Sequence, residues 1–251
     1  MQKVDLAFFM GQSNMAGRGT AALAPLVPPG MGWEYKAVSA PHCLTPMIEP
    51  FGLGEDRPGG VYEPGKKTGS LVSAFTCAFT AITRQPLVGL SCAKGGSAIG
   101  EWVPGTAYYR DAVSRAAACR RWLSRNGYQV ERCFMVWCQG CTDGDLHTPP
   151  ELYRAETARF LRSFMGECGV EVCFLIPIGN HRDDPALYAP IRSAQYTLAA
   201  REEKVVVVGE QFQTFASQGL MKDEFHYLQQ GYDLVGAEAG TQAALWLARR
   251  P

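Results

Sequence analysis

The chain has 251 residues, and its 24 Lys and Arg balance its 24 Asp and Glu, so the formal net charge at pH 7 is zero. This charge balance argues against an electrostatic grip on nucleic acid or on an anionic membrane, and it favours small, roughly neutral partners. A chain of this length can bury a substantial core, and we expect one domain over residues 1–251. No apolar run approaches the roughly 18 residues that span a bilayer.

The amino terminus and the cysteines both favour a cytoplasmic protein. The chain enters an apolar segment at once, without the basic, apolar and small-residue pattern of a signal peptide, although a shortened chain would look the same. Most of the nine cysteines lie in apolar segments, where thiols usually serve as small core hydrophobes in a reducing compartment.

The first predicted element is a buried strand at residues 4–10, which is apolar apart from Asp5 and is followed directly by Gly11. Ser13 lies on the turn that follows, at the carboxyl end of the strand, where an open α/β sheet places its chemistry. A serine there is either a nucleophile, which needs a histidine base from elsewhere in the chain, or the cap of the next helix.

The next segment, residues 20–67, is rich in Pro and Gly and shows no sustained period, so we expect a long excursion over the surface. Long loops of this kind are usually functional or mobile. We interpret it as a wall of the site, with Trp33, Tyr35 and Tyr62 available to stack on a substrate. The alternative is that these aromatic residues cover the core.

From residue 70 onwards, apolar strands alternate with helices. The predicted helices lie at residues 70–83, 108–126, 151–165, 185–203 and 229–249, and the strands after the first lie at 86–92, 130–137, 170–176 and 205–208. This alternation predicts a five-stranded parallel sheet with helices on both faces, in one three-layer α/β/α domain.

Glycine-rich or polar residues follow the second and third predicted strands. Gly95 and Gly96 could offer backbone N–H groups to a developing oxyanion, and the side-chain amide of Gln139 could supply another donor. The alternative for the glycine pair is a simple turn.

The segment before the last helix contains Asp223 and His226, three residues apart in a turn. A carboxylate at this spacing can reach the imidazole and hold its tautomer and orientation. A surface turn explains the same pair unless it meets the serine and the donor loops.

Together, these motifs resemble the SGNH hydrolase superfamily, and more closely its branch of carbohydrate esterase family six and sialate O-acetylesterase-like proteins. The resemblance spans almost the whole chain, in the family's order. The matching residues are Gly11-Gln12-Ser13-Asn14-Met15, Gly95-Gly96-Ser97-Ala98-Ile99 with Trp102, Trp137-Cys138-Gln139-Gly140 with Asp143, and Asp223-x-x-His226 followed by Gly231.

The resemblance implies a flavodoxin-like fold with Ser13 as nucleophile, His226 as base and Asp223 as the partner that orients it. The oxyanion hole implied by the resemblance uses the N–H groups of Ser13 and of the glycine pair, with the Gln139 amide. Three further residues are candidates for substrate binding, namely Gln12, Asn14 and Trp102, although Trp102 alone is equally explained by packing. The family's usual chemistry removes acetyl groups from the hydroxyls of xylan, sialic acid or related glycans, and it implies no metal or cofactor.

One residue departs from the family's pattern. Related proteins commonly carry glutamate directly after the Gln-Gly of the third motif, whereas this chain has Cys141. The role of that carboxylate is therefore absent from this chain or is supplied by another group. We therefore expect this chain to share the family's reaction type more closely than its substrate preference.

Three other functions compete with an esterase. Cys138 and Cys141 have the C-x-x-C spacing of a thiol–disulfide oxidoreductase. The same cysteines with His147 could contribute to a zinc site, but no fourth ligand is evident at a sensible spacing. A non-catalytic carbohydrate-binding relative of the fold is the third alternative.

Overall fold

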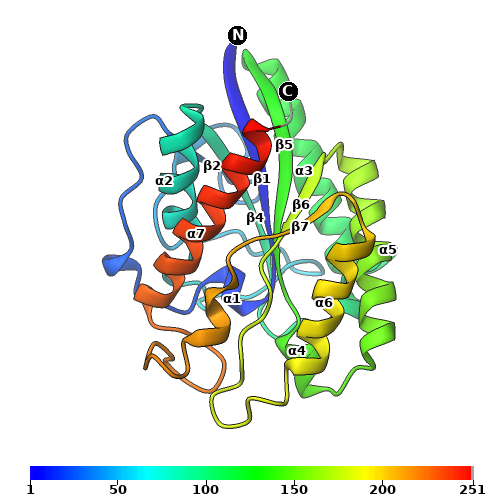
Figure 1. Cartoon of the computed structure of the whole chain (residues 1–251). Coiled ribbons are helices and arrows are strands. Elements are labelled where there is room, and N and C mark those ends of the chain that lie inside the picture. Colours follow the sequence, from blue (N-terminus) through cyan, green and yellow to red (C-terminus); the bar gives the residue numbers. More distant parts are fainter. Residues whose placement is uncertain (250–251) are drawn as a thin grey trace.

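A computed structural model describes residues 1–249 and shows an α/β/α sandwich around a central seven-stranded sheet (Figure 1). The last two residues of the predicted domain lie outside the described part. The strands are β1 (Gln2–Gly11), β2 (Gly32–Tyr35), β3 (Leu44–Pro46), β4 (Leu87–Ala93), β5 (Tyr128–Cys138), β6 (Val172–Leu175) and β7 (Val205–Val207). The helices are α1 (Ser13–Ala16), α2 (Val72–Thr83), α3 (Ala107–Arg125), α4 (Cys141–Asp145), α5 (Pro150–Cys168), α6 (Ala189–Arg201) and α7 (Gln229–Ala248), and short 3₁₀ turns lie at Ala21–Leu23, Ile99–Glu101 and Glu210–Thr214.

The predicted fold class is confirmed, but the strand count was wrong. The sheet runs in the order β3-β2-β4-β1-β5-β6-β7, and all neighbouring strands are parallel except β3, which is antiparallel to β2. The two additional strands come from the Pro- and Gly-rich excursion. They are only four and three residues long, too short for the alternation that identifies a strand in a sequence.

Five of the helices form two layers that cover opposite faces of the sheet. Helices α2 and α7 pack together on one face, and α3, α5 and α6 cover the other (Figure 1). Each layer buries its own apolar cluster, one rich in phenylalanine around α2 and one that includes Trp102 and Trp137. Within residues 1–249, no helix has the length and apolar character needed to cross a bilayer.

The predicted helices match the observed ones closely at four of five positions. The exception is the segment 185–203, whose helix begins only at Ala189. Pro190 lies in the first turn of α6, where a missing N–H costs nothing, so the helix starts there and the residues before it form turns.

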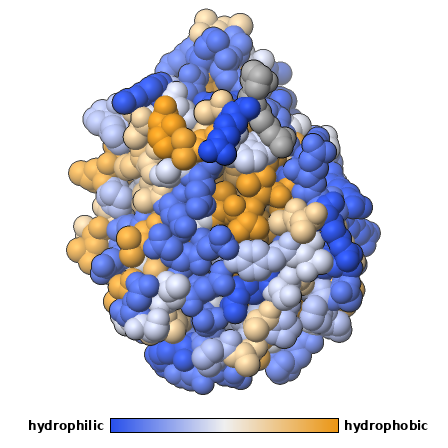
Figure 2. All heavy atoms as spheres, viewed as in Figure 1, coloured by the Kyte–Doolittle hydropathy of each residue, from blue (hydrophilic) through white to orange (hydrophobic). Residues whose placement is uncertain are grey.

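The sheet's edge reaches the surface beside α7. Strand β7 is the last strand of the sheet, and its residues Val206 and Val207 are only partly buried. Figure 2 shows hydrophobic residues at the surface in this region, next to the more hydrophilic outer faces of the helices.

Strand β1 occupies the centre of the sheet, between β4 and β5. After β1 the chain first adds strands on the β4 side of the sheet and later adds strands on the β5 side. Such a change of direction predicts a crevice beyond the carboxyl end of β1. Gly11 ends the strand with φ +137°, and a Cβ atom there would overlap the Cys138 carbonyl. Only glycine allows β1 and β5 to approach so closely before the chain turns into α1.

A buried ion pair fastens the long excursion to the core. Arg115 of α3 is completely buried and donates from Nε and Nη2 to Asp111 Oδ2, at 3.0 and 2.9 Å. The same oxygen accepts the Val61 backbone N–H at 2.9 Å. Helix α3 therefore holds the part of the excursion that lies next to the carboxyl ends of the strands.

We expect Asp111→Ala to lower the free energy of unfolding by about 3–5 kcal/mol, because it leaves the buried Arg115 charge with only the longer ion pair to Glu55, at 3.7 Å. Urea unfolding followed by circular dichroism measures this change. Arg162→Ala is the matched control, since its ion pair with Glu202 lies at the surface and should leave stability unchanged. Equal stability of the two variants would contradict the anchoring role.

Candidate active site

The structure brings Ser13, His226 and Asp223 into one hydrogen-bonded chain. His226 Nε2 lies 2.9 Å from Ser13 Oγ, and its Nδ1 lies 2.8 Å from Asp223 Oδ2. The other carboxylate oxygen, Oδ1, accepts the backbone N–H groups of Phe225 and His226 at 3.1 and 2.7 Å. The turn that carries the histidine thereby fixes the carboxylate that orients it.

Asn14 connects the two distant segments of this chain of hydrogen bonds. Its Nδ2 donates to the Phe225 carbonyl at 3.0 Å, and its Oδ1 accepts from the Tyr232 hydroxyl at 2.8 Å. The side chain is only 3% exposed. The prediction that Asn14 binds substrate is therefore not supported, because its polar atoms are occupied in holding the 223–226 turn against α1.

The surroundings set the protonation states of the pair. Burial lowers the pKa of His226 below its ordinary 6.5, and Arg18 and Lys222 add to this, against the opposing effect of Asp223. Burial alone would raise the pKa of Asp223, but hydrogen bonds from the His226 ring and from two backbone N–H groups hold it below 3.8. At neutral pH the imidazole is thus available as a base and the carboxylate is charged.

A small pocket of about 190 Å³ opens over Ser13 and His226. It lies beyond the carboxyl ends of β1, β4 and β5, as the strand order requires. It is lined by Gln12, Ser13, Arg18, Gly95, Gly96, Cys141, Thr142, Asp145, Phe225 and His226.

The backbone N–H groups of Ser13 and Gly96, which both line this pocket, have no hydrogen-bond acceptor within residues 1–249. The N–H of Gly95, which was also predicted as an oxyanion donor, instead donates to Glu63 Oε2 at 2.6 Å. Of the glycine pair, only Gly96 therefore has a donor free for a ligand.

Gln139, the other predicted oxyanion donor, has other hydrogen-bond partners in this structure. Its Nε2 donates to the Ser97 carbonyl at 2.9 Å and to Asp143 Oδ2 at 2.5 Å, so both amide hydrogens are used. The side chain is fully buried and does not line the pocket. Asp143 also accepts the Ile99 N–H, so these side chains join the loop after β4 to the loop after β5.

The two other candidates for substrate binding differ in position. Trp102 is fully buried, donates from Nε1 to Ser97 Oγ at 2.9 Å and packs on Trp137, so it belongs to the core. Gln12 does line the pocket, but its Oε1 accepts the Gly140 N–H at 2.7 Å. The aromatic residues of the excursion do not line the pocket either, and Tyr35 is buried.

Sequence reasoning missed several residues of the pocket. Arg18 and Phe225 lie close in sequence to the predicted serine and histidine, so proximity alone could have indicated them. Asp145 of α4 also lines the pocket and accepts from the Tyr188 hydroxyl at 2.8 Å. Cys141 lies at the start of the same short helix, so this chain has a carboxylate in the pocket although it lacks the family's usual glutamate.

The two alternatives based on cysteine gain no support. Cys138 and Cys141 are buried, and burial raises the pKa of Cys138 to about 12 and that of Cys141 well above its ordinary value. A redox motif needs an accessible thiol of low pKa. Within residues 1–249, no group of three or more His, Cys, Asp or Glu side chains is arranged to hold a metal ion.

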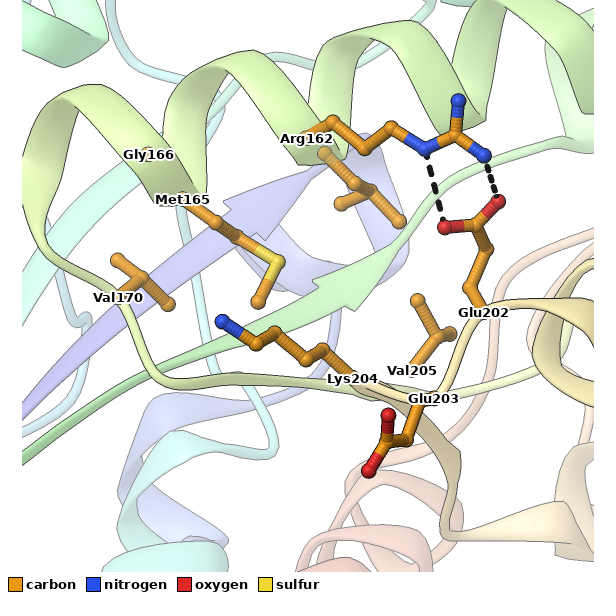
Figure 3. A pocket seen from close by; sticks show the side chains of 9 residues that line it. Arg162, Met165, Gly166, Val170, Glu202, Glu203, Lys204 and Val205 are labelled. Carbon is orange, nitrogen blue, oxygen red and sulfur yellow. Dashed lines mark hydrogen bonds and ion pairs between the residues drawn. The ribbon is translucent and has the colours of Figure 1, made fainter.

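A larger cavity of about 310 Å³ lies elsewhere, between α5 and the start of β7 (Figure 3). Its apolar side chains are Leu161, Met165, Val170 and Val205, with the Arg162–Glu202 ion pair and Lys204 at the rim. It contains no serine, cysteine or histidine. We therefore place the candidate active site at the Ser13 pocket.

The family described as "Carbohydrate esterase, sialic acid-specific acetylesterase" matches residues 3–244 of the chain. In the search of curated proteins, no match was found.

Solved structures share the fold at low sequence identity. A protein from Arabidopsis thaliana has a TM-score of 0.74 at 22% identity, with 96% of this chain and 98% of that chain covered. A carbohydrate acetylesterase from Xanthomonas citri has a TM-score of 0.57 at 14% identity, with 96% and 55% covered. A mutant of an acetyl-xylooligosaccharide esterase from Geobacillus has a TM-score of 0.51 at 12% identity, with 97% and 95% covered.

We expect the His226 imidazole to titrate below pH 6.5, because its pocket disfavours the charged form. Asp223→Asn should lower this pKa further, since the carboxylate stabilises the imidazolium. NMR titration of the imidazole protons measures both values, and loss of the signal in His226→Gln assigns it. A midpoint above 6.5 in the wild type would contradict the described environment.

Proposed function

Because the chain belongs to the family of carbohydrate esterases described as sialic acid-specific acetylesterases, we propose that it removes acetyl groups from carbohydrate hydroxyls through an acyl-serine intermediate. Membership makes it an ester hydrolase of the SGNH type. The observation that carries the proposal is the chain of hydrogen bonds from Asp223 through His226 to Ser13, in an open pocket.

In the proposed mechanism, neutral His226 takes the proton of Ser13 Oγ while that oxygen attacks the ester carbonyl. The imidazolium then gives the proton to the leaving sugar oxygen, and the charged Asp223 stabilises it in between. Water repeats the attack on the acyl-serine, so acetate leaves and the serine is regenerated. The lowered pKa of His226 keeps the base unprotonated at neutral pH.

The negative charge of the tetrahedral intermediate needs preorganised donors. We assign this role to the backbone N–H groups of Ser13 and Gly96, which line the pocket and have no acceptor within the described residues. Backbone donors suit this task because the fold holds them in place before the reaction, so little reorganisation is needed.

The size of the pocket and the hydrogen-bonding groups in its lining support an acetylated sugar as substrate. A volume of about 190 Å³ is small beside the 300–1,000 Å³ typical of sites for drug-sized ligands, which favours a short acyl group. Thr142 and Asp145 also line the pocket and can hydrogen-bond to hydroxyl groups of the alcohol part.

Ser13→Ala should reduce kcat on p-nitrophenyl acetate by at least about 10³-fold, because the variant lacks the nucleophile. Its folding should remain intact, since Ser13 Oγ bonds only to the catalytic histidine among the described residues. Release of p-nitrophenolate measures the rate, and near-ultraviolet circular dichroism checks the fold. Wild-type protein that is no faster than Ser13→Ala would instead support the non-catalytic alternative.

The wild type should release acetate from acetylated sugars, and it should cleave p-nitrophenyl acetate much faster than p-nitrophenyl octanoate. Parallel assays of acetylated xylo-oligosaccharides and acetylated sialic acids, with Ser13→Ala as control, identify the sugar class. Activity on the p-nitrophenyl ester with none on either sugar class would leave an esterase and contradict the carbohydrate assignment.

A further inference from the structure

An ion pair between Arg18 and Glu63 lies beside the glycine turn at the pocket. The two side chains are only 15% and 6% exposed. One carboxylate oxygen of Glu63 bonds to Arg18 Nη2, and the other accepts the Gly95 N–H at 2.6 Å. A single carboxylate therefore joins the excursion to the residue next to the free donor of Gly96.

The arginine is itself held by carbonyl groups from two segments. Its Nη1 donates to the carbonyls of Gly17 and Lys66, at 2.7 and 2.9 Å. Gly17 directly follows the short helix that carries Ser13. The pair thus connects the serine segment, the excursion and the glycine turn.

The turn at Gly95 and Gly96 leaves room for this ion pair. A Cβ atom on Gly95 would overlap both the Arg18 guanidinium and the Glu63 carboxylate, so the ion pair packs directly against the Gly95 Cα. Gly96 has φ +69° and open space next to its Cα. The first glycine is therefore needed for contact with the protein, and the second faces the pocket.

The peptide group between these glycines contains the Gly96 N–H. Hydrogen bonds hold both the carbonyl of this peptide group and the N–H group that precedes it. The Gly95 N–H is bonded to Glu63, and the Gly95 carbonyl accepts from Lys94 Nζ at 2.5 Å. The peptide unit is planar, so fixing its carbonyl and the preceding N–H also fixes the direction of the Gly96 N–H.

From this geometry we propose that Glu63 is a positioning residue, which acts through Gly95 to aim the Gly96 N–H at the oxyanion. The inference rests on the proposed esterase function. Oxyanion donors must lie about 2.7–3.1 Å from the developing charge, and a misplacement of about 1 Å can cost about 10²-fold in rate.

Glu63→Gln tests the proposal with a side chain of nearly the same shape. Arg18 and Gly95 bond to different oxygens of the Glu63 carboxylate, and the amide replaces one of these oxygens by an NH₂ group, so one of the two bonds is lost in this geometry. We expect kcat on p-nitrophenyl acetate to fall about 10- to 100-fold, with KM within about twofold. The inhibition constant of an alkyl boronic acid, which forms an anionic tetrahedral adduct with serine, should rise in parallel.

Glu101→Gln is the matched control. Its carboxylate accepts the Ala98 N–H at 2.9 Å, so it makes the same kind of bond to the same loop without touching Gly95 or lining the pocket. Its kcat and boronate inhibition should match those of the wild type. Burst titration of reactive Ser13 counts the folded sites, so each rate is compared per active site even when a variant is less stable.

The outcomes separate the two proposals. An unchanged kcat and boronate affinity in Glu63→Gln, with an active wild type, would overturn the positioning role and leave the esterase intact. Equal losses in Glu63→Gln and Glu101→Gln would also overturn it, because general loosening of the loop would then explain both. A wild type no faster than Ser13→Ala would refute the esterase itself.

Discussion

The candidate site depends on one hydrogen bond, between His226 Nε2 and Ser13 Oγ, which joins residues 213 positions apart in the chain. It forms because β1 lies at the centre of the sheet and ends at a glycine that lets the chain turn closely past β5. The segment before α7 then has to reach the same edge of the sheet. Asn14 holds it there through the Phe225 carbonyl.

Amide side chains around the site connect loops from different strands. Asn14 joins the serine helix to the histidine turn, and Gln12 accepts an N–H from the loop after β5. Gln139 bonds to Ser97 and to Asp143 across the gap between the loops after β4 and β5. Buried polar groups need partners, and these bonds pair the Asn14 amide, the Gln12 oxygen and the Gln139 nitrogen while they hold loops from different strands in a fixed relation.

The excursion has a role that its composition does not indicate. Arg115 and Asp111 hold it to α3 near Val61, and two residues further on Glu63 reaches the glycine turn. We expected the excursion to form a wall of the site through aromatic residues that stack on a substrate, but its aromatic residues do not line the pocket. Polar and charged groups of the excursion make the contact, and charge pairing across more than 30 residues leaves no local pattern for sequence analysis to find.

Local patterns in the sequence determined the class of fold, the order of the main strands and helices, and the serine, aspartate and histidine that the structure brings together. Apolar runs, helical periods and short motifs are properties of neighbouring residues, so they can be recognised without the fold. Only the tertiary structure decided which polar groups remain free. Gly95, Gln139 and Asn14 have the right chemistry for oxyanion or substrate contacts, but partners from distant segments occupy them. The reason is physical: a buried donor or acceptor must be satisfied, and the group that satisfies it is chosen by packing between segments that the sequence keeps far apart.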